Sequence, residues 1–587
     1  MAKLIAFDFE TTPIKNGTPE VLYLTAHGEN NYKISIPIQG KSKNKLKLLR
    51  DVLEQHFLTE ENNGAQFVGW NANKFDSYFI AKALLESDKW MLQPYMTASK
   101  ALRGVRVKEK IPSLYCEKSK RFKSLSYEFL DGIAMTGVSV TLAKFLKTFA
   151  PKFEKLDAPN FEAGEHFNSK NKKHVLYAER DSEGLYHGMQ KVSEIINDLT
   201  GLELKPTVGN LAIRHFMDNI PEGVILNRPT DNLLQILHGD VKRGGYCWAM
   251  RQYHGPVWKY DINQAYAAAM RDAELPAGDC AITDQYLAGM PGIYDCTLSR
   301  AKPCKVPFYY KHEKQGLFSI GKKPVRTWIT STEIEHLKRD GWQVETHNGY
   351  VWQSSFNMRK FVDRLEKLRL TDKDGPKGPL GTMVKALGNN AYGKTLERIW
   401  GQEFVFSKER PDGYDLYDSF NPDASFIFSR DRKSFPKKYH LPQIGVFVTA
   451  YVRCIVREAA IKEQDHFLYA DTDCVMFSKP VMHLDVHKTR YGAWKQEADG
   501  YTIIVIGKKV YHSEDGSKAK GLIVKNLTEQ DYRLWLKGKL PIQTQCQRQN
   551  ILTFLSGKDM FKTLMRKGTD VHLSKTVKCL EGFFVPA

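Results

Sequence analysis

Two acids separated by one residue lie at the centre of the segment HFLYADTDCVMF, with short apolar runs on both sides. The runs 467–469 and 475–477 predict two strands, and Asp471 and Asp473 lie at the tight hairpin turn between them. Because residues i and i+2 of a strand point to the same side, we expect both carboxylates to face one point. A divalent cation is the usual reason to tolerate such crowding, whereas Asp and Thr are also common in ordinary turns. The segment alone leaves both interpretations open.

The composition narrows the class of protein. A chain of 587 residues with 42% apolar and 12% aromatic residues predicts several globular domains. Lysine and arginine outnumber acids by 86 to 67, and the net charge of +19 favours a polyanionic partner, with nucleic acid first. The nine cysteines are scattered and form no CxxC pair, which argues against a disulfide framework or a zinc site and favours a reducing, cytoplasmic setting. We expect neither a membrane segment nor a signal peptide.

Four further acids in the first third of the chain form a second candidate metal site. Asp8 and Glu10 are i and i+2 on a predicted strand, Asp76 follows later, and Tyr177 and Asp181 share one face of a predicted helix. Such acids can bind two metal ions, one activating a water and one stabilising the leaving oxygen of a phosphodiester, while Tyr177 orients the water. Each piece alone has a purely structural alternative, such as a helix N-cap at Asp76.

Residues 388–395, GNNAYGKT, match the phosphate loop of ATPases letter for letter. That loop needs a buried strand before it, and residues 382–387 do not read as one. On a helix, in contrast, Lys385, Asn389 and Tyr392 share one face at i, i+4 and i+7. We therefore favour the helix.

In chain order, these motifs resemble those of family B DNA polymerases with a proofreading 3′–5′ exonuclease. DxE, Nx3FD and Yx3D resemble the three exonuclease motifs, and the strand-ending Asp261 with Tyr266 resembles polymerase motif A. KxxxNxxYG resembles motif B, YADTD resembles motif C, and Lys509 with Tyr511 resembles the KxY motif. The resemblance covers nearly the whole chain, and it implies two-metal phosphoryl transfer with two Mg²⁺ ions, or Mn²⁺, in each active site.

The resemblance implies a role for each matching side chain. In the polymerase site the implied catalytic acids are Asp261, Asp471 and Asp473, and the implied metal ligands are Asp261, Ile262 and Asp473. The implied nucleotide contacts are Ile262, Tyr266, Lys373, Lys385, Asn389 and Tyr392, with Lys377 competing with Lys373. In the exonuclease site the implied metal ligands are Asp8, Glu10, Asp76 and Asp181, with Tyr177 beside the nucleophile. A catalytic lysine is also implied, and both Lys152 and Lys155 qualify.

A further group of residues is implied to contact DNA. Its members are Thr11, Asn71, Phe75, Thr141, Leu142, Arg243, Gly244, Gly245, Thr449, Arg453, Lys509 and Tyr511. The chain departs from the family pattern at four positions, where Lys242, Ala267, Val452 and Cys474 replace tyrosine, proline, glycine and serine.

The resemblance implies an α/β multidomain fold, with an RNase H-like exonuclease domain followed by a right-hand polymerase that carries two insertions. The implied segments are the exonuclease (1–200), palm (201–275 and 441–533), first insertion (276–358), fingers (359–397), second insertion (398–440) and thumb (534–587). The insertions resemble the terminal-protein regions of protein-primed polymerases from phages with small linear genomes. A terminal protein that donates the priming hydroxyl is then the implied partner, and the second insertion implies processivity and strand displacement.

Several alternatives remain open. Initiation could instead use an ordinary primer or none. A phosphate-loop ATPase, a dedicated nuclease or a non-catalytic binding protein would each leave part of the motif series without a purpose. The expected partners are a primer-template DNA and deoxynucleotides, and we expect a monomer.

Overall fold

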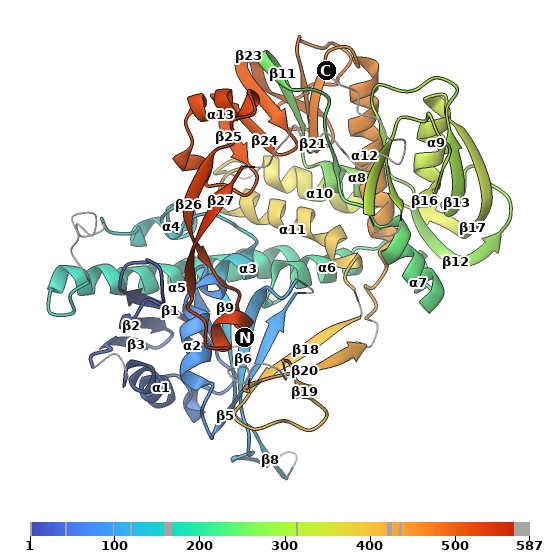
Figure 1. Ribbon diagram of the computed structural model, residues 1–587. Coiled ribbons are helices and arrows are strands. Elements are labelled where there is room, and N and C mark those ends of the chain that lie inside the picture. Colours follow the sequence, from blue (N-terminus) through green and yellow to red (C-terminus); the bar gives the residue numbers. More distant parts are fainter. Residues whose placement is uncertain are drawn as a thin grey trace.

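The computed structural model describes residues 3–40, 44–97, 99–117, 120–157, 167–312, 315–371, 373–398, 400–418, 425–433 and 437–568. The fold is α/β and multidomain, as predicted, and its three largest sheets have ten, seven and four strands (Figure 1). The predicted segments 1–200, 276–358, 359–397, 398–440 and 534–587 lie partly outside the described residues. Over the described ranges, no helix is both long enough and apolar enough to cross a membrane.

The N-terminal sheet is organised around β1 (Leu4–Thr11), whose first half is buried. β1 pairs antiparallel with β2 (Val21–Gly28) and parallel with β4 (Gln66–Gly69), and β4 pairs parallel with β9 (Ser126–Asp131). Parallel strands end at the same edge of a sheet, and polar residues there are well placed to form a site. The acids at the end of β1 and the residues that follow β4 and β9 therefore meet at one edge.

Two helices bring the remaining N-terminal motifs to this edge. α2 (Asp76–Leu84) begins directly after the loop that follows β4. α5 (Lys172–Thr200) packs against β1 and β2 and ends at Gly201, whose φ of 66° is the left-handed cap conformation that glycine adopts easily. Tyr177 and Asp181 lie on the buried side of α5, as their i, i+4 spacing predicts.

The seven-stranded sheet carries the second set of acids. Its central strands are β21 (Phe467–Thr472), β22 (Cys474–Phe477), β11 (Tyr253–Ile262) and β23 (Trp494–Gly507), in that order. The edges are completed by β10 (Tyr246–Ala249), β24 (Val510–Ser513) and β25 (Gly516–Ala519). β21 and β22 form the hairpin predicted for the segment 467–477.

Helices support and overhang this sheet. α12 (Pro442–Lys462) packs against β21, β22 and α8 (Ala265–Asp272). α10 (Arg359–Leu370) and α11 (Pro379–Thr395) form a helix pair, and α11 also packs against α6 (Val208–Asp218). Because α11 includes the whole GNNAYGKT segment, that segment is helical and is not a phosphate loop.

Residues 275–356 contain a sheet of their own, at the position predicted for the first insertion. The sheet is formed by β12 (Leu275–Thr283), β17 (Gln343–Phe356), β13 (Gly292–Ser299) and β16 (Val325–Thr330). Helix α9 (Ser331–Arg339) packs on this sheet and also against α12. The unit has its own apolar cluster and a separate hairpin, β14 (Phe308–His312) and β15 (Gln315–Ser319).

The N-terminal sheet contains strands from a segment far along the chain, which was not expected from the sequence. β18 (Trp400–Phe406) meets β5 (Trp90–Met96) at the pair Phe406–Leu92 and pairs along its length with β20 (Ile427–Lys433). The described part of the segment predicted as the second insertion thus extends the N-terminal sheet, so the two regions form one continuous sheet.

The C-terminal hairpin returns to the N-terminal domain. β26 (Ile542–Arg548) and β27 (Phe561–Lys567) pair antiparallel, and Figure 1 shows them in red between the seven-stranded sheet and the N-terminal domain. The short helix α14 (Ile551–Leu555) between them contributes to the N-terminal apolar cluster. The start of β27 also pairs with the N-terminal region, because the N–H of Phe561 donates to the Gly17 carbonyl at 3.0 Å.

Candidate active sites

Three carboxylates meet at the edge of the N-terminal sheet. Asp8 and Glu10 project from β1 and Asp181 projects from α5, and their ligand oxygens lie within 4.8 Å of one another. All three line a cleft of about 700 Å³. The strand spacing and the helix spacing together produce the convergence that the motifs predict.

The electrostatics of this trio fit a bound cation. Burial raises the pKa of Asp8 well above its usual value, and the charges of Asp181, Asp76 and Glu10 add to the effect. Burial and Asp181 raise the pKa of Glu10 to about 7. Asp181 Oδ1 is buried and has no hydrogen-bond partner among the described residues. Crowded carboxylates with an orphaned oxygen fit Mg²⁺ or Mn²⁺, because these ions prefer oxygen ligands.

Asp76 lies beside the trio, at the first residue of α2, and is only 5% exposed. Burial raises its pKa to about 7, with a contribution from the buried Asp131. Asp131 accepts hydrogen bonds from the backbone N–H of Asn73 (3.0 Å) and of Ile133 (2.8 Å), so it fixes the turn that leads into α2. Sequence reasoning missed Asp131, although an acid directly before a short helix is a recognisable N-cap signal.

The position of Lys155 separates the two lysine candidates. Its ammonium donates a hydrogen bond to Asp181 and lies 4.7 Å from the centre of the Tyr177 ring. Burial alone would lower the pKa of Lys155, but Asp181 outweighs it and raises that pKa. Lys152 is exposed, in the short turn 151–153. The geometry therefore favours Lys155.

Changing Lys155 to alanine is expected to lower 3′–5′ degradation about 100-fold, the order of loss when one group that stabilises developing charge is removed. The matched control is Lys152→Ala, which should stay within twofold of the unaltered chain. Degradation of a labelled single strand measures both. Loss of degradation in Lys152→Ala with retention in Lys155→Ala would reverse the assignment.

Most of the other predicted exonuclease residues surround the same cleft. Asn71, Thr141, Leu142 and Tyr177 all line it. Thr11 and Phe75 are not among the lining residues: the Thr11 hydroxyl donates to the Thr12 carbonyl, and the Phe75 ring packs against Phe79 and Phe561. The predicted contact of these two side chains with single-stranded DNA therefore lacks support from their placement.

In the seven-stranded sheet, strand register brings Asp261 and Asp473 together. Asp261 lies opposite Cys474, and the Ile262 N–H donates to the Asp473 carbonyl at 2.8 Å. Burial raises the pKa of Asp261 to about 7, assisted by Asp473 and Glu497. Burial likewise raises the pKa of Asp473. The two acids are 212 positions apart in sequence. A bound cation would offset the repulsion between their negative charges.

Asp471 differs from the expectation for its hairpin. Thr472 has a φ of 69°, and the Asp473 N–H donates to the Asp471 carbonyl at 2.9 Å, so the chain reverses between the two acids. Asp471 instead binds Lys509 at 2.8 Å and Lys518 at 3.3 Å. Burial alone would raise the pKa of Asp471, but these lysines outweigh it and lower that pKa. The same-side rule fails here because Asp473 lies in the turn and not on a strand.

Glu497 is a member of this site that sequence reasoning missed. It lies on β23, contributes to the raised pKa of both Asp261 and Asp473, and binds Lys259 at 2.6 Å. Its neighbour Lys495 lies opposite Asp261 in the sheet. Only the register between β11 and β23 reveals this proximity, because the local sequence has no distinctive spacing.

The helix pair carries the predicted nucleotide contacts. The rings of Tyr266 and Tyr392 stack at 4.3 Å with an interplanar angle of 17°, which joins α8 to α11. Lys385 is exposed on α11, and Asn389 is half-buried on the same helix. Lys373 is exposed in the loop between α10 and α11, as is the competing Lys377. The structure thus brings Tyr266 and Tyr392 together and leaves both loop lysines available.

Three predicted DNA contacts are buried inside the protein. Arg243 and Arg453 both bind the carboxylate of Glu333, at 2.8 Å and 2.9 Å, and their side chains are 0% and 4% exposed. Thr449 is buried and donates to the Val446 carbonyl. These side chains do not reach the surface, so their placement does not fit direct contact with a phosphate. For the two arginines the reason is Glu333, a partner far away in the sequence.

The remaining predicted contacts lie around the hairpin turn. A side chain at Gly245 would meet the Thr472 backbone at 2.9 Å, so the close approach requires glycine there, whereas Gly244 is exposed. Lys509 is held by Asp471, and the half-buried Tyr511 packs against Tyr469.

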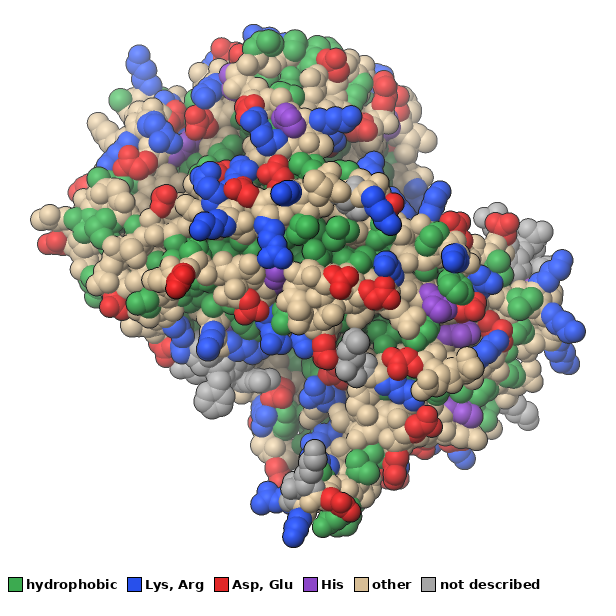
Figure 2. Space-filling model, turned by 180° about the vertical axis from the view of Figure 1, so that it is seen from behind, with side chains coloured by type: hydrophobic (Ala, Val, Ile, Leu, Met, Phe, Trp, Pro, Cys, Tyr) green, Lys and Arg blue, Asp and Glu red, His purple; other side chains and the backbone are tan. Residues whose placement is uncertain are grey.

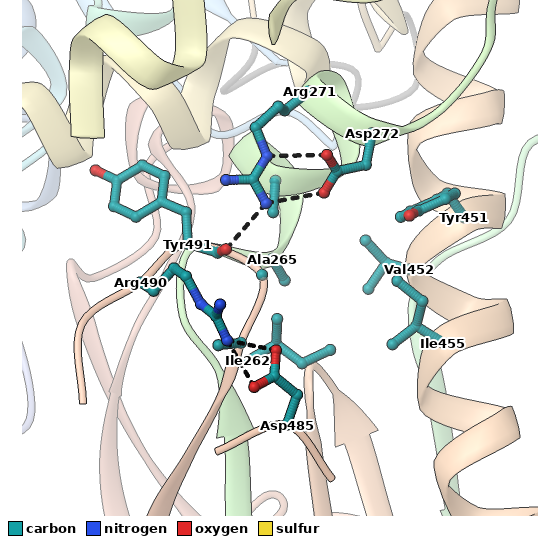
Figure 3. Close-up of a pocket in the computed structure, with 13 residues that line it drawn as sticks. Ile262, Ala265, Arg271, Asp272, Tyr451, Val452, Ile455, Asp485, Arg490 and Tyr491 are labelled. Atoms are coloured by element: carbon teal, nitrogen blue, oxygen red, sulfur yellow. Dashed lines mark hydrogen bonds and ion pairs between the residues drawn. The ribbon is translucent and has the colours of Figure 1, made fainter. Parts of the chain in front are cut away.

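A cavity of about 260 Å³ lies beside the strand that carries Asp261 (Figure 3). It is bordered by the ion pairs Arg490–Asp485 and Arg271–Asp272, and Arg271 also donates to the Tyr491 carbonyl. The adjoining loop holds Asn263, whose N–H donates to the Ala493 carbonyl at 3.0 Å. The cavity's lining contains none of the predicted catalytic acids, and the loop braces the end of β11.

Comparison with known proteins shows which family the chain belongs to. A model of the family "DNA polymerase type B, organellar and viral" matches residues 154–473, more than half of the chain. A probable DNA polymerase of Ascobolus immersus is 22% identical over 524 residues, which cover 77% of this chain and 41% of the fungal protein. The DNA polymerase of Bacillus phage Nf is 24% identical over 293 residues, which cover 46% of this chain and 48% of the phage protein. The chain thus spans less than half the length of these relatives.

The fold is also similar to that of a solved DNA polymerase structure. Phi29 DNA polymerase complexed with primer-template DNA and incoming nucleotide substrates superposes with a TM-score of 0.72, at 16% identity, over 97% of this chain and all of that one. At this identity the likeness concerns the fold, which confirms the predicted architecture. The matched family, together with the site geometry, identifies the chain as a member of the type B DNA polymerases of organelles and viruses.

Proposed function

We propose that the chain is a DNA-directed DNA polymerase with a 3′–5′ exonuclease. The observation that carries the proposal is the presence of two separate groups of acids with raised pKa values, one beside the N-terminal sheet and one beside the seven-stranded sheet. One is the trio of Asp8, Glu10 and Asp181, and the other is the pair Asp261 and Asp473. A dedicated nuclease would need only the first group, and a binding protein would need neither.

At the polymerase site, Asp261 and Asp473 would hold two Mg²⁺ or Mn²⁺ ions. When bound, these ions lower the pKa of the primer 3′-hydroxyl and stabilise the leaving pyrophosphate. The exposed ammonium of Lys385 would bind the triphosphate, with Lys373 as a second contact. The stacked rings of Tyr266 and Tyr392 would form the floor beneath the sugar and base. Asp471 would act indirectly, because it orients Lys509 beside the turn.

At the exonuclease site, the cleft would receive a frayed single-stranded 3′ end. Asn71, Thr141 and Leu142 line its walls. Lys155 would stabilise the charge that develops on the phosphate, and Tyr177 would orient the attacking water. Asp181 is buried and Asp8 is half-buried, which weakens the screening of these interactions by bulk water.

Tyr266 should exclude a 2′-hydroxyl and so select deoxynucleotides. The change Tyr266→Ala is expected to raise kcat/KM for ribonucleotides relative to deoxynucleotides about 10- to 100-fold, the range for one small group in a packed pocket. Tyr266→Phe keeps the ring and is the matched control. Single-nucleotide incorporation measures the ratio. An unchanged ratio in Tyr266→Ala would remove Tyr266 from this role.

Net charge supports a nucleic-acid partner. Positive charges exceed negative charges by 19. Figure 2, which shows the molecule from behind, has Lys and Arg side chains spread over this back face and along the projection at the bottom. Figure 1 places β8 (Arg121–Lys123) at that projection. Contacts to phosphates carry no sequence information, so base pairing would supply the specificity. Because the protein would bind mainly the charged phosphates, its affinity for a primer-template should fall steeply as the salt concentration rises.

Protein priming is a further part of the proposal. Two features support it: the unit formed by residues 275–356 and the strands added by the second insertion, which lie where protein-primed polymerases have their two insertions. The relatives include phage DNA polymerases. We therefore propose a monomer that uses a terminal protein on a linear genome, with strand displacement, in the host cytoplasm if a phage encodes it. The alternative is a polymerase that uses an ordinary primer or none.

Synthesis on a linear template, with and without a candidate terminal protein, tests the priming. Labelled nucleotide covalently attached to that protein is the expected result. Synthesis only from an added oligonucleotide, with no labelled protein, would favour the alternative. The polymerase assignment itself is tested by Mg²⁺-dependent extension of a primer, and its absence from the folded chain would refute it.

A further inference from the structure

A buried ion network joins the first insertion to the palm. Glu333 is 1% exposed, and its two carboxylate oxygens bind different arginines. Oε2 accepts from Arg243 at 2.8 Å, and Oε1 accepts from Arg453 at 2.9 Å. Glu333 lies on α9 of the insertion, Arg453 lies on α12, and Arg243 lies in the segment before β10. One carboxylate therefore ties together three parts of the chain.

Both arginines also donate to backbone carbonyls, and the two sets of carbonyls lie on opposite sides of this junction. Arg243 donates to the Tyr309 carbonyl at 2.8 Å and to the Trp328 carbonyl at 3.2 Å, both in the insertion. Arg453 donates to the carbonyls of Arg243 (3.1 Å) and Gly244 (3.2 Å), in the two-glycine segment. Glu333 thus orients the guanidinium that holds this segment in place.

The same two helices meet a second time, one turn further along. Arg457 of α12 binds Asp340 at 2.6 Å and contacts His336 at 2.9 Å. Arg453 and Arg457 are i and i+4 on α12, so both point toward α9. The contact between the insertion and the palm is therefore an extended buried interface and is not a flexible tether.

The network leads directly to the turn that carries the polymerase acids. Gly245 follows the carbonyl that Arg453 holds, and a Cβ at Gly245 would lie 2.9 Å from the Thr472 Cα. Tyr246 then pairs with Thr472 in the sheet. Thr472 lies between Asp471 and Asp473 and has a φ of 69°. Close-packed backbone transmits small displacements, so a shift of the two-glycine segment would move the turn.

Stability alone is a weak explanation for this network. Replacing a buried ion pair or triad with apolar residues of similar volume is often neutral or stabilising, whereas removing one partner leaves an uncompensated buried charge. Burial would raise the pKa of Glu333, but the two arginines outweigh it and lower that pKa, so the carboxylate is ionised. A permanent charge with fixed geometry suits a role in positioning.

We infer that Glu333 is a positioning residue for the polymerase site, acting through Arg453, Gly244 and Gly245 on the Thr472 turn. The first insertion is then required for extension of an ordinary DNA primer, even without a protein partner. The inference rests on the proposed polymerase function. It concerns only the seven-stranded sheet, so the exonuclease site on the N-terminal sheet serves as an internal reference.

The primary test compares Glu333→Gln with the unaltered full-length chain in primer extension, with the affinity for primer-template measured separately. We expect kcat for extension to fall about 100-fold, the loss that a displacement of about 1 Å can cause. Primer-template affinity and 3′–5′ degradation should stay within twofold. The matched control is Glu335→Gln on the same helix, whose side chain is 48% exposed and which should extend normally.

Extension by Glu333→Gln within twofold of the unaltered chain would overturn the inference. So would a loss of extension that follows weaker DNA binding, or one matched by an equal loss of degradation. A chain that shows no extension before any change would refute the proposed function, and this inference with it.

A second variant covers the case in which Glu333→Gln does not fold. The triple change Arg243→Met, Glu333→Leu and Arg453→Met replaces the network with apolar side chains, so folding should be retained. If the network positions the turn, this variant melts at or above the temperature of Glu333→Gln but still extends slowly, with normal degradation. Full extension by the triple variant would show that the network serves stability alone.

Discussion

Changing Asp473 to alanine is expected to lower primer extension at least 1000-fold, beyond the loss of about 10²- to 10³-fold for a single stabilising hydrogen-bond donor. The register between β11 and β22 brings Asp261 and Asp473 together. Removing one of these carboxylates would take away one of the two ligands that hold the metal ions. Degradation of a single strand should remain within twofold, because Asp8, Glu10 and Asp181 lie on β1 and α5, away from the seven-stranded sheet.

The folded state of this variant can be checked in the same preparation. The pKa of Asp473 is raised by burial and by Asp471, so its ionised form lowers stability at neutral pH in the absence of metal. Removing it should leave Tm in EDTA unchanged or higher. Loss of both activities by a variant with a normal Tm would contradict the two-site account.

Changing Asp8 to alanine is the converse experiment, with an expected loss of 3′–5′ degradation of at least 1000-fold. Burial and the charges of Asp181, Asp76 and Glu10 raise the pKa of Asp8, as expected for a carboxylate that a cation would stabilise. Extension should be preserved, and mismatched primer ends should be extended more readily. Misincorporation on a defined template, together with degradation of a labelled strand, measures both effects.

A suitable control for Asp8→Ala is a change to an exposed acid of the same domain, such as Glu61→Gln, whose side chain is 85% exposed. This control should leave both activities within twofold. Retention of degradation by Asp8→Ala would mean that the trio is not the exonuclease centre.

Local spacing was sufficient to predict the parts of the molecule that depend on a single element. The i, i+2 pair Asp8 and Glu10 and the i, i+4 pair Tyr177 and Asp181 both project toward the cleft. The hairpin at 467–477 is also present as predicted. Such periodicities follow from backbone geometry alone, so they survive in the folded protein.

Features that depend on pairing between distant segments could not be predicted in this way. Arg243 and Arg453 looked available for DNA because Glu333 is 90 and 120 residues away from them. The Thr330–Glu333 capping box does signal a helix start, but it does not reveal which charges will meet the helix. Glu497 became visible only through the register of β23 with β11.

The structure shows what some of the residues that depart from the family pattern do, but not all of them. Lys242 donates to the Leu396 carbonyl, so it secures the end of α11. Ala267 is completely buried within α8. Nothing in the structure explains why Cys474 follows the acidic turn.

One measurement tests the central claim most directly, namely that one chain performs metal-dependent synthesis and degradation at separate sites. A 5′-labelled primer annealed to a longer template is incubated with the unaltered chain and Mg²⁺, with and without the four deoxynucleotides, in parallel with Asp473→Ala and Asp8→Ala. The account predicts elongation with deoxynucleotides, shortening without them, and loss of only one of these in each variant. Primers that remain unextended by the folded, unaltered chain in Mg²⁺ or Mn²⁺ would contradict it.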